Sequence, residues 1–141
     1  MASAFDERAV ASALINHIRG VLPGVKGYPA PAASMATPCV IPTMEYELNA
    51  GFGGTSGKIT CDLLILVSPG AGDTGQKTLY QLISGTDSAG IPAAIATDET
   101  LGGAVQGVRV VGPLSRTYER FDGDGNLTYL GRFLRLTIYP L

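Results

Sequence analysis

Residues 58–67 constrain the fold of this chain more than any other part of the sequence. Every second residue there is apolar, in the series Ile59, Cys61, Leu63, Ile65 and Val67. This period of two predicts a β-strand with one face turned to a core. Leu64 and Leu66 add apolar side chains to the other face at the far end. We therefore expect a central strand that is covered on both sides there.

Two hairpins are expected from the strand patterns. Residues 40–48 predict a strand that pairs antiparallel with residues 58–67 across a glycine-dense loop, residues 49–57. Pro42, near the start of the first strand, indicates a sheet edge or a bulge, because proline cannot donate to a ladder.

The second hairpin occupies the last quarter of the chain. It pairs residues 105–121 with the alternating residues 127–139. Gly112-Pro113 interrupts the first of these strands and predicts a bend or bulge. Residues 122–126 are rich in Asp, Gly and Asn, which tolerate positive φ and favour a turn.

Three segments have helical patterns. Val10, Leu14 and Ile18 recur at four-residue spacing and predict a first helix that ends near Gly20. A second helix carries an apolar stripe, and a short third helix is expected at residues 91–96. The stripe of the second helix consists of Leu79, Leu82 and Ile83.

The proline-rich residues 23–38 predict a meandering connection that could reach a neighbouring subunit. Taken together, the elements predict an α+β fold in a single domain, residues 1–141. We expect a four-stranded antiparallel or mixed sheet made of two hairpins, with two to three helices packed on one face.

Composition narrows the class of function. Charged residues make up 16% of the 141 residues, against about 25% in typical domains. A sparsely charged surface indicates burial against other chains or a bland monomer surface. The net charge of −2 comes with no basic stripe, which argues against strong phosphate-backbone binding. With no signal-peptide pattern and no long apolar run, we expect a protein that is cytosolic where it is made.

Known chemical motifs fit this sequence poorly. Asp122, Asp124 and Asn126 have the spacing that begins a calcium loop, but Leu127 and Phe133 replace its glycine and its last glutamate. After the glycine-dense residues 49–57, Lys58 is followed by Ile59 in place of the Ser or Thr of a phosphate-binding loop, and a strand follows instead of a helix. No cofactor and no metal site are expected.

The single histidine and the two cysteines predict no catalytic group. His17 lies beside the apolar stripe of the first helix, with no nucleophile turn in the chain to partner it. If residues 48 and 58 flank the turn of the first hairpin, Cys61 lies opposite Glu45 and far from Cys39. We therefore expect two free, mostly buried thiols. Since neither the histidine nor the cysteines form a catalytic group, we expect no enzyme activity.

The order and spacing of six segments resemble the tail terminator proteins of long-tailed phages, especially those of actinobacteria. The resemblance spans most of the chain and begins with a helical start before these segments. The segments are Pro38-Cys-Val-Ile-Pro42, Cys61-Asp-Leu-Leu-Ile-Leu-Val67, the helix with Leu79, Leu82 and Ile83, Ile91-Pro-Ala-Ala-Ile-Ala96, Asp98-Glu-Thr-Leu-Gly-Gly103 and Tyr129-Leu-Gly131.

The resemblance implies a structural virion protein at the head-proximal end of the tail, assembled in the host cytoplasm. It implies a homo-oligomeric ring, usually a hexamer, that caps the tail tube, ends its polymerisation and joins it to the head–tail connector or stopper protein. DNA would pass through the ring without specific binding, and no membrane is involved. The candidate loops for the lumen or for partner contacts contain Phe52, Gly53, Gly54, Asp122 and Asp124.

Three alternatives remain open at this point. The chain could be another head–tail joining protein, such as a stopper or tail-completion factor. It could be a tail-tube subunit, which would polymerise into long tubes. A small-molecule binding domain is the third, although no cluster of polar residues in the sequence suggests a pocket.

Overall fold

The computed structural model describes residues 7–29, 36–48, 57–69, 74–114, 119–122 and 128–140. These residues form an α+β fold with helices and strands in mixed order. The elements are α1 (Glu7–Val21), β1 (Lys26–Gly27), β2 (Cys39–Leu48), β3 (Gly57–Val67), α2 (Thr74–Ile83), α3 (Ile91–Ala96), β4 (Val105–Pro113), β5 (Glu119–Asp122) and β6 (Thr128–Pro140).

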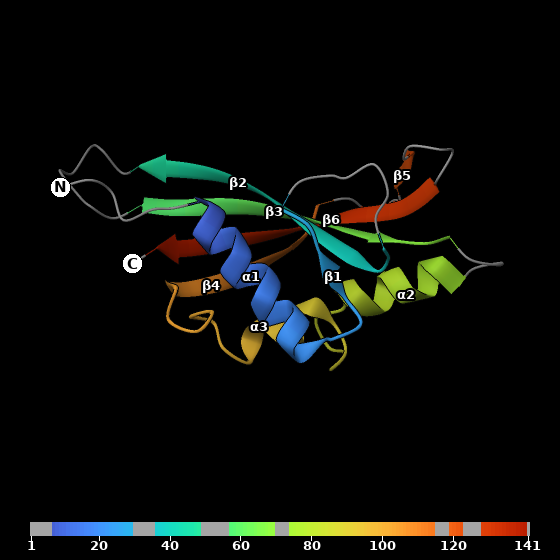
Figure 1. The fold of residues 1–141 in the computed structure, drawn as a ribbon, viewed down its shortest axis with the longest axis horizontal. Helices are drawn as coiled ribbons and strands as arrows, with labels where there is room; N and C mark the ends of the chain where they lie inside the picture. Colours follow the sequence, from blue (N-terminus) through green and yellow to red (C-terminus); the bar gives the residue numbers. More distant parts are fainter. Residues whose placement is uncertain are drawn as a thin grey trace.

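The strands form one mixed sheet in the order β1-β2-β3-β6-β4, with β5 also paired to β6. Among the pairings of the described strands, only the short one of β1 with β2 is parallel. The long strand β6 pairs on one side with β3, and on its other side with β4 and then β5. The three helices gather on one side of this sheet (Figure 1).

The main core lies between the sheet and the three helices. The period-two side chains of β3 face it as the sequence predicts, and Leu63, Leu134 and Leu136 are 0% exposed. The helices contribute their own buried stripes, which are Val10, Leu14, Ile15 and Ile18 from α1, Leu79, Leu82 and Ile83 from α2, and Ile91 and Ile95 from α3. The apolar side chains that recur with helical spacing and those that recur with strand spacing therefore pack together in one layer.

A smaller apolar cluster lies on the opposite side of the sheet, which we call the outer face. It consists of the buried Cys39, Ile41, Leu66 and Tyr129. Tyr28 and Leu64 are partly buried against it. This agrees with the expectation that the far end of the central strand is covered on both faces.

Two strand predictions need correction. The predicted count of four strands is wrong, because the described residues alone form a sheet of six. β1 is two residues long within the proline-rich connection, too short for any periodicity to indicate it. Residues 105–121 contain two strands, β4 and β5, which follow one another along β6. The expected irregularity is confirmed, since the register shifts between Val110 and Gly112 and Gly112 has a φ of 139°.

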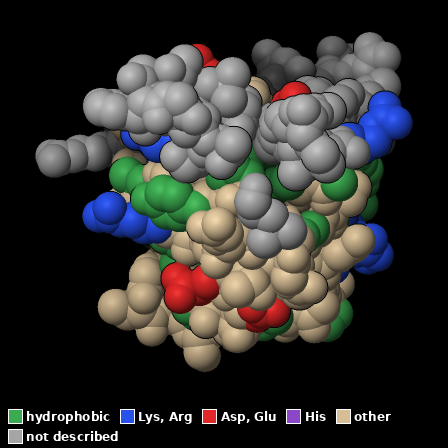
Figure 2. Space-filling view, turned by 90° about the vertical axis from the view of Figure 1, so that its left-hand side faces the viewer, with side chains coloured by type: hydrophobic (Ala, Val, Ile, Leu, Met, Phe, Trp, Pro, Cys, Tyr) green, Lys and Arg blue, Asp and Glu red, His purple; other side chains and the backbone are tan. Residues whose placement is uncertain are grey.

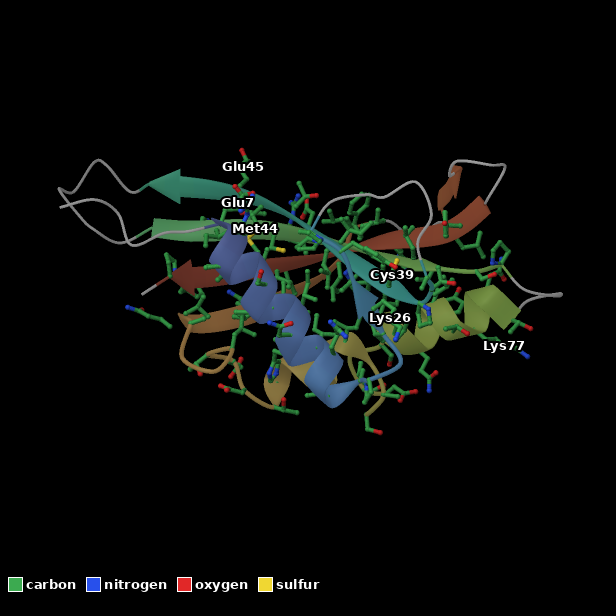
Figure 3. All side chains as sticks on the ribbon, viewed as in Figure 1. Glu7, Lys26, Cys39, Met44, Glu45 and Lys77 are labelled. Atoms are coloured by element: carbon green, nitrogen blue, oxygen red, sulfur yellow. The ribbon has the colours of Figure 1, made fainter. Side chains whose placement is uncertain are left out.

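The predicted register of the first hairpin is wrong by one residue. Leu48 pairs with Gly57, so Met44 lies opposite Cys61 and Glu45 lies opposite Thr60. A slip of one residue exchanges the two faces of a strand. Met44 therefore faces the helices and Glu45 stands on the outer face, as Figure 3 shows for both labelled side chains.

Candidate interaction surfaces of the sheet

The outer face is polar in its middle, where one ion pair joins its two central strands. Arg135 of β6 donates from Nε to Oδ1 of Asp62 at 2.8 Å and from Nη2 to Oδ2 at 3.1 Å. The hydrogen bonding of Arg135 to Asp62, followed by the charge of that carboxylate, raises the pKa of Arg135, and the charge of Glu45 adds to this. The side chains of Arg135 and Asp62 are 41% and 29% exposed, so solvent weakens their attraction. The ion pair therefore mainly fixes the orientation of these two side chains.

One end of the sheet is bounded by the outer side of β2, which we call the β2 edge. Lys26 and Tyr28 donate from their backbone N–H groups to the carbonyls of Pro38 and Val40. Even-numbered residues of β2 therefore direct their backbone groups outward. Past Val40, no strand in the described parts of the chain pairs with this edge. The missing N–H of Pro42 points outward, which confirms its predicted edge position.

The opposite end is bounded by the outer side of β4, the β4 edge. Leu114 donates its N–H to the carbonyl of Phe133, so the nitrogen of the preceding Pro113 points away from β6. Pro113 therefore marks an edge in the same way as Pro42. Gly112-Pro113 predicted only a bend or bulge, although the proline is also a signal for a sheet edge.

Exposed apolar side chains accumulate near the β4 edge. Val111 is 57% exposed, Leu114 is 46% exposed, and Tyr139 of the neighbouring β6 is 41% exposed. In Figure 2, the charged side chains of the described residues lie at separate places on the end of the molecule that faces the viewer. A strand edge with exposed apolar side chains is a typical site for contact with another chain.

His17 joins two helices. Its Nε2 lies 2.8 Å from the carbonyl oxygen of Ala94 and 3.0 Å from Oγ1 of Thr97. Oγ1 of Thr97 itself donates to the Ala94 oxygen at 2.7 Å. The imidazole N–H thus joins α1 to the last turn of α3 through a hydrogen bond.

Both cysteines are free and buried, as the sequence predicts. Burial raises the pKa of Cys39 to about 11. Burial, with the charge of Asp62 adding to it, raises the pKa of Cys61 to about 12. Cys61 belongs to the main core and Cys39 to the outer-face cluster, so the sheet separates them.

We expect both thiols to resist a thiol reagent such as dithiobis(nitrobenzoate) in the folded protein at pH 8. Raised pKa values keep the reactive thiolate scarce, and burial blocks the reagent. Two equivalents should react at once in guanidinium chloride. Fast reaction of Cys61 in the folded protein would contradict its placement in the core.

The predicted contact loops lie mostly outside the described residues. Phe52, Gly53, Gly54 and Asp124 fall there. Asp122, predicted as the first residue of the turn, is instead the last residue of β5, where it pairs with Thr128 of β6. Within the described ranges, no group of three or more His, Cys, Asp or Glu residues is arranged to hold a metal ion. None of the described helices is long and apolar enough to cross a membrane.

No protein-family model matches the sequence, and the search of curated proteins returned no match.

Proposed function

We propose that this chain is a structural virion protein of a long-tailed phage that forms a ring on the end of the tail tube. The ring ends polymerisation of the tube and presents a surface to the head–tail connector. DNA passes through it without specific binding, for which a weakly acidic chain is suited.

One observation carries the proposal. The sheet ends in two edges, the β2 edge and the β4 edge, and the described strands leave both open on their outer sides. A chain with two different sheet edges can join copies of itself head to tail, and such contacts form rings when the rotation closes. The low charge and the resemblance of six ordered segments to tail terminators support the same reading.

The test is to add the purified protein to terminator-free tail tubes of the cognate phage and to image the tube ends by electron microscopy. We expect a compact disc on one end of each tube and an arrest of tube growth in the presence of excess tube subunit. Tubes made of this protein alone would identify a tube subunit instead. Bare tube ends, with binding to the connector only, would identify a different joining protein.

A further inference from the structure

We propose that copies of this chain join edge to edge, with β4 of one copy pairing antiparallel with β2 of the next so that Arg109 lies opposite Glu45. The inference rests on the proposed function, because it describes how the ring would be held together. Backbone direction, hydrogen-bonding groups and side chains each support this pairing.

Strand direction allows it. β2 and β3, β3 and β6, and β6 and β4 are all antiparallel neighbours, so β2 and β4 of one chain run in opposite directions. A rotation about an axis along the strands leaves the direction of β2 unchanged in the next copy. β4 of one copy and β2 of the next are then antiparallel and extend the alternation of the sheet.

The backbone groups select a register. Phe133 accepts a hydrogen bond from Leu114, so it directs its backbone groups toward β4. Thr137 lies an even number of residues further along β6 and does the same. Its partner Arg109 therefore directs its own backbone groups toward β6. Val108 and Val110 therefore direct theirs outward. On the β2 edge the outward groups belong to even-numbered residues. Pairing residue 44 with 110 and residue 46 with 108 uses outward groups on both strands and leaves 45 opposite 109.

The side chains match in that register on both faces. Glu45 and Arg109 are exposed, and their partners Thr60 and Thr137 place both on the outer face. An acidic and a basic side chain would therefore meet, in the type of pair where side chains approach most closely.

Met44 and Val110 form the matching pair on the helix side of the sheet. Both are partly buried against the main core. In Figure 3, Met44 points toward the helices and Glu45 points away from them. The register also brings Pro42 opposite the bulge residue Gly112, so the ladder ends at the same point on both strands.

Charge disfavours the two symmetric alternatives. A dimer joined through two β2 edges in the register centred on Glu45 would bring the Glu45 side chains of both copies together. A dimer joined through two β4 edges in the register centred on Arg109 would do the same with Arg109. Like charges across strands are destabilising, so the mixed pairing, which can close into a ring, is the favoured contact.

Disulfide trapping tests the register. In the Glu45→Cys/Arg109→Cys variant, mild oxidation should produce a covalent ladder of oligomers, because such pairs have Cα atoms about 4.5 Å apart. The matched control, Thr43→Cys/Arg109→Cys, shifts the pair to a diagonal about 7–8 Å apart and should cross-link poorly. The native cysteines stay out of the reaction because they are buried.

Charge reversal tests the contact independently. Glu45→Arg alone and Arg109→Glu alone should each weaken self-association about tenfold or more, and the double variant should restore it. Light scattering over a range of concentrations measures the association, and circular dichroism checks the fold. Single reversals that leave association unchanged would overturn the interface, as would equal trapping in the control variant.

The outcomes separate this inference from the proposed function. Rings that cap tubes but do not cross-link would overturn the interface and leave the function standing. Cross-linked rings that ignore tail tubes would support the interface and overturn the function. A protein that stays monomeric at every concentration, with no trapped ladder, would overturn the interface.

Discussion

Leu63→Ala is expected to lower the free energy of unfolding by about 2–5 kcal/mol, the usual loss for a leucine truncated in a core. Leu63 is 0% exposed in the central strand β3, and its cross-strand neighbours are Pro42 on β2 and Leu134 on β6. The sheet and the helices enclose it from all sides, so the cavity cannot easily collapse. Urea unfolding followed by circular dichroism measures the loss.

The adjacent residue supplies a matched control. Leu64 is only partly buried and packs on the outer-face cluster. Leu64→Ala removes the same atoms on the other side of the same strand, so it should cost clearly less than Leu63→Ala. Equal losses for the two variants would contradict the assignment of the two faces. A larger loss at Leu64 would show that the outer face is the main core.

Strand alternation made the centre of this fold predictable from sequence. Residues 58–67 have apolar side chains at every second position, and the structure places a strand there that buries that set. The third helix, α3, also has the expected bounds, because Pro92 and the apolar residues around it define a short helix. Both patterns involve residues that are close together in the chain, so the sequence alone is enough to predict the strand and the helix.

The errors arose where the structure depends on longer-range pairing. The register of β2 on β3 depends on which two residues flank the loop between them, and the side-chain pattern did not reveal that pair. The resulting slip of one residue put Glu45 on the wrong face. β1 is held by backbone hydrogen bonds to Pro38 and Val40, which leave no trace in residue type.

The candidate contact residues show the same limit. The loops with Phe52 and Asp124 were predicted as contacts because glycine and aspartate mark turns, but these residues lie outside the described ranges. Glu45 and Arg109 were not predicted, because neither residue is distinctive until the strand order places them at opposite ends of one sheet. Strand order comes from the pairing of β3 with β6, which are far apart in the chain.

Gly75→Ala is the second substitution with a large expected effect. Gly75 lies in the first turn of α2, where its N–H donates to the carbonyl of Pro69 at 2.9 Å. A Cβ atom there would contact the carbonyl oxygen of Ser68 and would lie 2.6 Å from that of Pro69. These are backbone atoms that cannot rotate away, so α2 must shift from the end of β3, a strain of about 1–3 kcal/mol.

Gly20→Ala tests whether the loss at Gly75 comes from this close approach or from glycine replacement in general. Gly20 is an exposed residue of α1, and a Cβ atom there would have no neighbour within 4 Å. Alanine should stabilise the protein at this position by about 0.5–1 kcal/mol, because it favours the helix. Thermal and urea unfolding of the two variants should therefore shift in opposite directions. If Gly75→Ala left the free energy of unfolding unchanged, α2 would not pack closely on the end of β3. Other contacts would then have to hold the helices against that end of the sheet.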